Sequence, residues 1–226
     1  MSGTSKETFL ARVAAALGEG RQVARRLPCD PALVERVGTD QDLLELFENR
    51  AVAVGIEVVR VTNESTGEFL IAHLQKADVS CVSLSDDPLL GDEIRGGLAA
   101  AGIEVIGDAS EAWADRLYDE VGVGVTVATA GVAATGSIAC VSSSQEARAL
   151  SLVPPRHIAL LPSDRIVADL QDLWRSRGPL ALRPLPSCVT LVTGPSKTAD
   201  IEGVLINGVH GPGVVTVFLI VGEEGR

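Results

Sequence analysis

The regular alternation of strand-like and helix-like segments between Ile56 and Ile106 restricts the possible folds of this chain most strongly. The strand-like runs are 56–61, 79–84 and 103–106, and the helical segments begin at a predicted Ser65/Glu68 capping box and at Leu89. Strands that alternate with helices at these intervals are joined by right-handed crossovers. The sequence therefore predicts an α/β fold in three layers, with a single, mainly parallel or mixed sheet covered by helices.

The 25 positions between Glu120 and Glu146 contain no charged residue. A stretch of this length could cross a bilayer, but it is rich in Gly, Thr, Ser and Val and is interrupted at Gly131. Two buried strands, 123–127 and 137–141, joined by a short loop explain it better. We therefore predict no membrane span.

The remaining periodicity extends this pattern to both ends of the chain. It predicts helices over 4–17, 40–54 and 163–178 and buried strands over 154–161, 188–192 and 214–221. The first helix carries an apolar stripe that could dock on its own domain or on a partner. We predict an N-terminal helical arm and linker over 1–39 and an α/β domain over 40–226.

Composition and charge exclude several classes of function. The net charge is −11, which argues against general binding to nucleic acids or anionic membranes. The cysteines are far apart, form no Cys-x-x-Cys pair and have no histidine cluster beside them: Cys29, Cys81, Cys140 and Cys188. Neither a metal site nor an iron–sulfur cluster is therefore expected in this chain. Reduced cysteines and an N-terminus without an apolar signal segment predict a cytoplasmic protein.

The stretch Gly194–Glu202 is the first candidate site. It follows the predicted strand 188–192, and Ser196, Lys197 and Thr198 together suit an anion. Asp200 and Glu202 could cap the next turn, pair with Lys197 or face a ligand. An ordinary capped turn with a solvated lysine remains the alternative interpretation.

Two further loops could complete such a site. Thr135, Gly136 and Ser137 offer hydroxyls and a closely approachable backbone, although a plain tight turn is equally consistent with them. His210 lies between Gly208 and Gly211 and is the best-placed proton acceptor in the sequence. Its alternative role is that of a turn residue that satisfies a backbone group. His157, at the start of a predicted strand, is interpreted as a structural hydrogen-bonding residue.

These motifs together resemble the LUD domain of the lactate-utilisation protein C family. The resemblance is carried, in order, by Thr135-Gly136, Pro155-x-His157-Ile158, Gly194–Glu202 and Gly208–Pro212, followed by a hydrophobic terminal strand. It extends over about residues 40–221. One departure is Ala134, where the family commonly has an acidic residue, so an acid/base role for that loop is in doubt.

The resemblance implies a fold akin to the sugar-phosphate isomerase and coenzyme A transferase group. It also implies a part in oxidising L-lactate to pyruvate, together with an iron–sulfur subunit and a second cysteine-rich subunit. On this interpretation the chain is a non-redox subunit that binds a small carboxylate, and iron–sulfur clusters reside on its partners. The alternative is a self-sufficient enzyme that acts on a phosphorylated or coenzyme A-linked metabolite.

Overall fold

The structure is a computed structural model that describes residues 5–17, 30, 35–38, 40–107, 113–175, 178–181, 186–201 and 204–222. The chain divides into two compact units, residues 1–33 and 34–226. The first unit contains helix α1 (Lys6–Leu17), which buries none of its residues. Ser5 begins this helix, because its hydroxyl accepts the backbone N–H of Thr8 at 3.2 Å. Thr4, where the predicted helix begins, lies outside the described residues.

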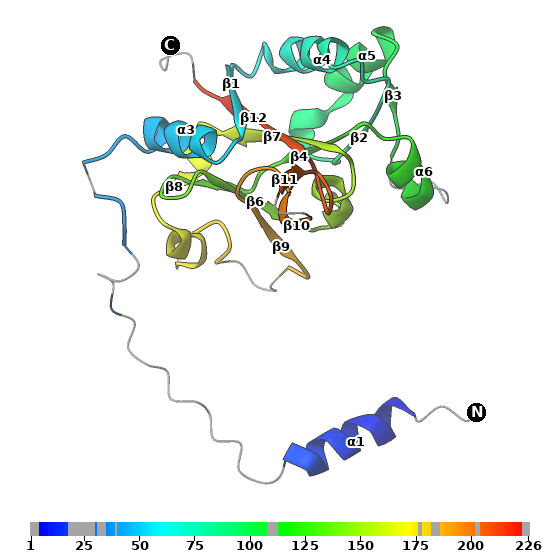
Figure 1. The fold of residues 1–226 in the computed structure, drawn as a ribbon, viewed down its shortest axis with the longest axis vertical. Helices are drawn as coiled ribbons and strands as arrows, with labels where there is room; N and C mark the ends of the chain where they lie inside the picture. Colours follow the sequence, from blue (N-terminus) through cyan, green and yellow to red (C-terminus); the bar gives the residue numbers. More distant parts are fainter. Residues whose placement is uncertain are drawn as a thin grey trace. The chain divides into compact units, whose positions relative to one another are not determined.

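A six-stranded parallel sheet forms the centre of the second unit (Figure 1). In spatial order its strands are β1 (Glu57–Val61), β12 (Val214–Ile220), β7 (Arg156–Pro162), β4 (Val123–Val127), β2 (Cys81–Leu84) and β3 (Glu104–Val105). The inner strands are apolar on both sides, as expected of a parallel sheet that is covered on both faces. The α/β fold with a mainly parallel sheet is thereby confirmed.

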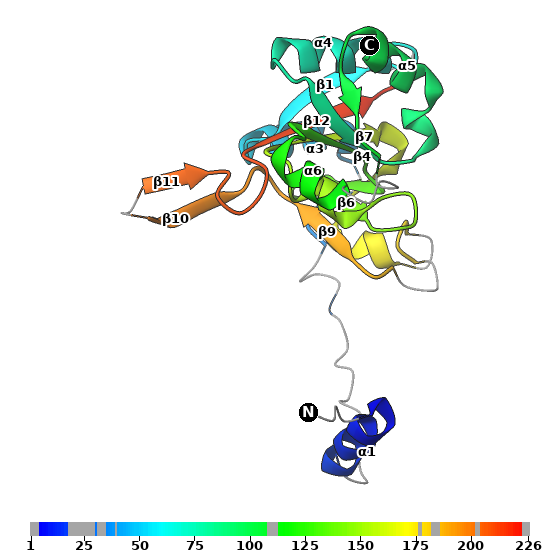
Figure 2. The same ribbon diagram turned by 90° about the vertical axis from the view of Figure 1, so that its right-hand side faces the viewer.

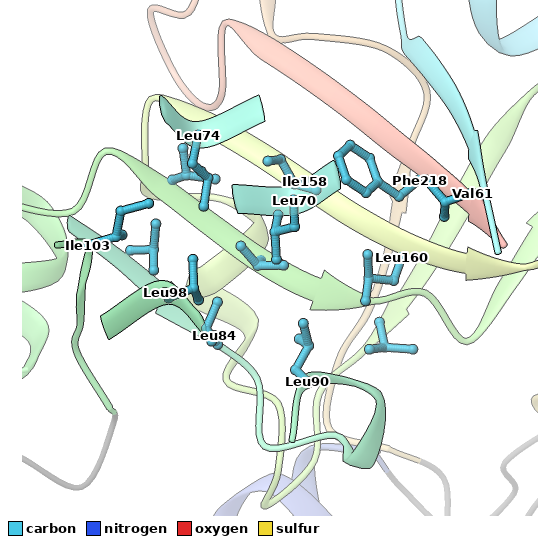
Figure 3. Close-up of a cluster of buried hydrophobic side chains, with 14 of the residues drawn as sticks. Val61, Leu70, Leu74, Leu84, Leu90, Leu98, Ile103, Ile158, Leu160 and Phe218 are labelled. Carbon is cyan, nitrogen blue, oxygen red and sulfur yellow. The ribbon is translucent and has the colours of Figure 1, made fainter. Parts of the chain in front are cut away.

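Helices α4 (Thr66–Lys76) and α5 (Asp92–Ala100) cover one face of this sheet (Figure 1). Figure 3 shows their leucines packed on Ile158, Leu160 and Phe218 of the sheet. The predicted capping box at the start of α4 does not form. The Ser65 hydroxyl instead accepts the N–H of Thr62 at 2.9 Å, because Ser65 has helical backbone angles. The 3-10 turn η1 (Pro88–Leu90) precedes α5, and helix α6 (Trp113–Asp119) precedes β4.

The opposite face is covered by helix α3 (Leu43–Ala53) and by a second sheet of four strands. These strands are β8 (Ile166–Val167), β5 (Ala130–Val132), β6 (Ser137–Val141) and β9 (Val189–Val192), in that order. Asp42 caps α3 by accepting the N–H groups of Leu44 and Glu45. The helix packs on the core through Phe47 and Ala51, both fully buried. The unit therefore has three layers.

The prediction of a single sheet is wrong. The chain leaves the main sheet after Val127, and residues 130–141 form the antiparallel hairpin β5–β6 of the second sheet. The predicted strands 123–127 and 137–141 are correct, but they belong to different sheets. Burial on both faces identifies an inner strand without indicating which neighbour it pairs with.

Two predictions for the later part of the chain also need correction. Residues 163–178 do not form the expected helix, because Ile166 and Val167 pair with Gly131 and Val132 between two 3-10 turns, η3 (Ser163–Arg165) and η4 (Leu170–Trp174). Strand β9 is only half-buried, since it forms an edge of the second sheet. Another 3-10 turn, η2 (Arg148–Ser151), precedes β7.

A two-stranded hairpin follows β9 where the sequence predicted a turn. It consists of β10 (Lys197–Ile201) and β11 (Val204–Asn207) and stands away from the two larger sheets (Figure 2). In the part of the chain that the structure describes, no helix has both the length and the apolar character that a bilayer crossing requires.

Candidate functional site

The predicted loop at Thr135–Ser137 is the turn of the β5–β6 hairpin and lies against helix α3. Gly136 has a φ of 65°, and a Cβ at this position would lie 2.2 Å from the Ala51 nitrogen. Only glycine allows so close an approach without displacing the helix backbone. The glycine that was predicted to face a ligand therefore serves the packing of α3.

A chain of hydroxyl groups links this turn to the end of β9. The Ser137 hydroxyl lies 2.7 Å from the hydroxyl of Thr135 and 2.7 Å from that of Thr193. Ser137 is buried, whereas Thr135 and Thr193 are exposed and keep hydrogen-bonding capacity for a ligand. Thr193 was not among the predicted site residues.

Gly194 and Lys197 meet the C-terminal end of the same helix. A Cβ on Gly194, which has a φ of 94°, would lie 2.5 Å from the Val54 carbonyl oxygen. The Lys197 ammonium donates to that oxygen at 3.3 Å. A cation at a helix C-terminus is favourable, because the carbonyl groups there carry partial negative charge. This contact agrees with a structural role for Lys197 and leaves two of its three donors for an anion.

Ser196 connects this region to the loop that carries His210. The Ser196 N–H donates to Pro212 at 2.8 Å, and the Gly208 N–H donates to the Ser196 carbonyl at 2.8 Å. His210 is exposed, and Gly211 lies beside the Ser196 side chain. The structure thus brings together three separate segments, 135–137, 193–197 and 208–213, which we call the amino-edge cluster.

This cluster lies at the edge of the main sheet where the strands begin. Gly55 precedes β1, Gly213 precedes β12, and the Gly213 N–H donates to Pro155, just before β7, at 2.9 Å. Ligands in open α/β sheets usually bind at the opposite edge, beyond the carboxyl ends of the strands. Of the other predicted residues, Thr198 and Asp200 lie on β10, and Glu202 lies outside the described residues.

A pocket of about 430 Å³ occupies that opposite edge. Its polar lining residues are Asp87, Thr129, Ser143, Gln145, Glu146 and Arg165. Asp87 follows β2, Thr129 follows β4, Glu146 follows β6 and Arg165 follows β7. We call this the strand-end pocket. None of its residues was predicted as a site residue.

Glu146 is held at the pocket by both its backbone and its side chain. Its N–H donates to the Ser143 hydroxyl at 3.1 Å, and its carboxyl oxygen accepts the N–H of Val127 at 3.3 Å. The residue is 8% exposed. Burial raises the pKa of Glu146 to about 7, with a further contribution from Asp87. A carboxyl group that titrates near neutrality is a frequent property of functional sites.

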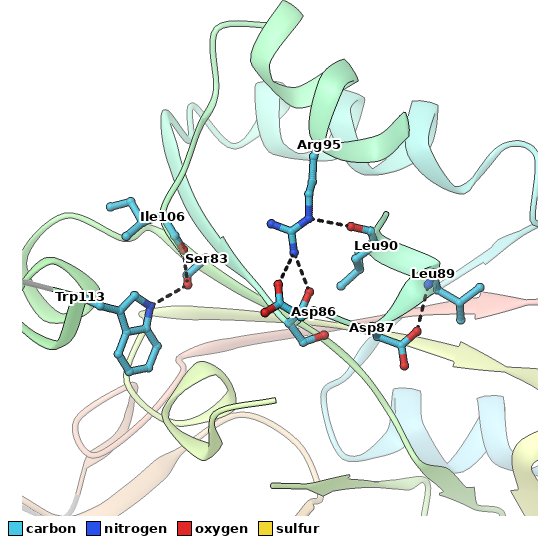
Figure 4. A network of polar contacts seen from close by, with 9 residues as sticks. Ser83, Asp86, Asp87, Leu89, Leu90, Arg95, Ile106 and Trp113 are labelled. Atoms are coloured by element: carbon cyan, nitrogen blue, oxygen red, sulfur yellow. Dashed lines mark hydrogen bonds and ion pairs between the residues drawn. The ribbon is translucent and has the colours of Figure 1, made fainter. Parts of the chain in front are cut away.

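Arg165 lies in η3, directly after β7, and donates to the Ala128 carbonyl oxygen at 3.3 Å. Among the described residues, no carboxylate forms an ion pair with it. Arg95, by contrast, pairs nearby with the Asp86 carboxylate and donates to the Ser85 and Leu90 carbonyl groups (Figure 4). Asp87 caps η1 through the N–H of Leu89 (Figure 4). Of the described residues that line this pocket, Arg165 is the only cation, and most of its donors are free for a ligand.

The sequence contains only a weak signal for the strand-end pocket. Glu146 is the first charge after the long uncharged stretch, and Arg165 follows a buried strand. Recognising them requires knowing which strands are neighbours, and that information is not local. The buried cysteines do not extend the site, since burial raises the pKa of Cys140 to about 12. Cys81 and Cys140 are buried, Cys188 is half-buried, and Cys29 lies outside the described residues.

Comparison with known proteins identifies the family. Residues 44–220 match the LUD domain, so the chain belongs to the LUD domain family, as its motifs predicted. It is 26% identical to lactate utilization protein C of Bacillus subtilis, over 97% of this chain and 97% of that protein. It is 28% identical to lactate utilization protein C 1 of Bacillus mycoides, over 99% of this chain and 100% of that protein.

Two other relatives have no such name. An uncharacterized protein of Neisseria meningitidis is 34% identical, in a match that spans 59% of this chain and 58% of that protein. The crystal structure of a DUF162 family protein from Deinococcus radiodurans is 18% identical, with a TM-score of 0.54, and the match covers 86% of this chain and all of that one. This likeness supports the α/β fold.

Proposed function

We propose that this chain is a subunit of an L-lactate-oxidising system, in which it binds a small carboxylate and acts with iron–sulfur partner subunits. The observation that carries the proposal is the similarity, over nearly the whole chain, to proteins named lactate utilization protein C. Membership of the LUD domain family agrees with it. Relatives of this kind support involvement in lactate utilization, and the partners and the ligand are our extension.

The chemistry of lactate oxidation supports this division of labour. Oxidation of lactate to pyruvate removes two electrons and two protons from the hydroxyl-bearing carbon and its oxygen. The sequence has neither a cluster motif nor a dinucleotide motif, so we assign the electrons to a partner subunit. A base is needed for the hydroxyl proton, and we propose His210 in this role. Its exposure in a glycine-rich loop next to Ser196 leaves the imidazole accessible to a ligand.

The first experiment compares the isolated chain with its native complex, purified through a tag on this chain. We expect no lactate oxidation by the chain alone and lactate oxidation by the complex. In the complex, His210→Ala should lower the rate about a hundredfold, which is a usual loss for a general base. His210→Asn serves as the matched variant, because asparagine can keep a turn hydrogen bond without accepting a proton at neutral pH.

Two outcomes would contradict parts of this proposal. Full activity of the His210→Asn complex would exclude a proton-transfer role for His210. Turnover of a phosphorylated or coenzyme A-linked substrate by the isolated chain would instead support a self-sufficient enzyme.

A further inference from the structure

We propose that the strand-end pocket binds a small organic acid, with Arg165 holding the carboxylate and the carboxyl group of Glu146 forming a hydrogen bond with a hydroxyl or keto oxygen of the ligand. The inference rests on the geometry of this pocket. It does not depend on the reaction in which the chain takes part.

The topology of the sheet is the first argument. From β2 the chain continues through α5 on one face to β3, and from the adjacent β4 it continues through β5 and β6 on the other face to β7. Neighbouring strands whose connections leave in opposite directions create a crevice beyond their carboxyl ends, where α/β proteins bind ligands. Asp87 follows β2 and Thr129 follows β4, so the strand-end pocket lies in this crevice.

Arg165 supplies the charge that an organic acid requires. A guanidinium group has five N–H donors, and among the described residues only the Ala128 carbonyl accepts from the one on Arg165. Its planar fork fits a carboxylate through two parallel hydrogen bonds. Arg165 donates to the Ala128 carbonyl, and Glu146 accepts from the Val127 N–H one residue earlier. The end of β4 therefore anchors both side chains.

Glu146 supplies the second contact and makes it depend on pH. Asp87, which follows β2, and Arg165 from η3 line the same pocket. Cys140 of β6 lies close enough to Glu146 for the carboxylate charge to raise the pKa of its thiol. Cys140 stays a neutral thiol at neutral pH, because its pKa is about 12. Glu146, whose pKa is about 7, is protonated in mild acid and can then donate a hydrogen bond. Above neutrality its negative charge, added to that of Asp87, repels an anionic ligand.

The size of the pocket is consistent with this ligand class. A volume of about 430 Å³ accommodates an acid of a few carbon atoms with some water. The hydroxyl groups of Thr129 and Ser143 offer further hydrogen bonds to such a ligand.

The test is a calorimetric titration of the full chain with pyruvate and, separately, with L-lactate, at about pH 6 and about pH 8.5 and constant ionic strength. We expect binding of at least one acid to weaken about tenfold or more at the higher pH, since Glu146 ionises between the two conditions. Glu146→Gln should bind equally at both pH values, because the amide keeps a donor and cannot ionise.

Two charge variants identify the site of binding. Arg165→Gln should weaken binding about ten- to a hundredfold at both pH values, the range expected for losing a charge-assisted contact. Arg148→Gln, which removes the same charge from the exposed surface of η2, should bind like the wild type. Thermal melts verify that each variant is folded.

Several results would overturn the inference. These are absence of binding at both pH values, normal binding by folded Arg165→Gln, and an unchanged pH dependence in Glu146→Gln. None of them decides whether the native complex oxidises lactate, so this experiment and the complex assay fail independently.

Discussion

Two buried side chains give this protein opposite responses to pH. His157 is fully buried, with its Nε2 atom 2.9 Å from the Thr126 hydroxyl, and burial lowers its pKa to about 4. In the unfolded state the pKa of a histidine is about 6.5. The native state, in which His157 is neutral, therefore loses stability as the pH falls from about 6.5 through 4. Glu146 behaves in the reverse sense. Burial raises the pKa of Glu146 to about 7 in the native state, compared with about 4.5 in the unfolded state. Its contribution to stability is therefore fully present at pH values below about 4.5 and is lost as the pH rises through 7.

Replacement of Glu146 by glutamine isolates the second effect. We expect Glu146→Gln to match the wild type near pH 5 and to exceed its unfolding free energy by roughly 2–3 kcal/mol near pH 8.5, at about 1.4 kcal/mol per unit of pKa shift. His157 is present in both proteins, so its contribution to the pH dependence cancels in the difference between their unfolding free energies. Urea denaturation across this range measures the difference, and Asp119→Asn on the exposed surface of α6 is the control. A constant difference at all pH values would contradict the raised pKa.

At the scale of elements, the position of α3 depends on residues that the sequence assigned to a ligand. Gly136 lies against its backbone, Gly194 approaches Val54, and Lys197 binds the Val54 carbonyl oxygen. The helix covers the main sheet through Phe47 and Ala51. Contacts between backbones are intolerant of added atoms, because neither side can change rotamer.

A single methyl group tests this packing. Gly136→Ala should lower the unfolding free energy by about 2–4 kcal/mol, since the new Cβ meets the α3 backbone and the residue must also keep a positive φ. Gly96→Ala is the matched control, because a Cβ there meets nothing within 4 Å and Gly96 lies in the middle of α5. Alanine at that position should stabilise the protein by about 0.5–1 kcal/mol. Equal stability of the two variants in urea denaturation would show that the α3 contact is adjustable.

At the scale of the whole molecule, the boundary of the α/β unit depends on a short segment before α3. The predicted boundary lies at residue 40, whereas the compact unit of the structure begins at residue 34. The N–H groups of Arg36 and Val37 donate to the Asp169 carboxylate at 3.0–3.3 Å, and Glu35 pairs with Arg175. Asp169 is 3% exposed, so these hydrogen bonds satisfy a buried charge.

Two truncated chains distinguish the boundaries. A chain that begins at residue 34 should unfold cooperatively at nearly the wild-type temperature, because α1 buries no residue. A chain that begins at residue 40 should be less stable by about 2–4 kcal/mol, since the Asp169 carboxylate loses its partners. Calorimetry of both measures this. Loss of the cooperative transition in the longer chain would show that residues 1–33 are needed for folding, and equal stability of the two would favour the boundary at residue 40.

Local sequence by itself determined much of the secondary structure. The apolar spacing of α3, the capping function of its first turn and the apolar runs of β1, β4, β7 and β12 depend only on neighbours along the chain. Parallel pairing followed from the same pattern, because a strand joined to the next by a helix must cross over. The family was also predictable, since each of its motifs is a short run of consecutive residues.

Tertiary structure alone decided which strands share a sheet and which residues share a site. The strands 123–127 and 137–141 have similar compositions, yet one lies in the main sheet and the other in the second. Glu146 and Arg165 meet at one pocket only because β4 lies between β2 and β7. Strand order is set by contacts between residues distant in sequence, whose apolar side chains are nearly interchangeable, so no local pattern encodes it.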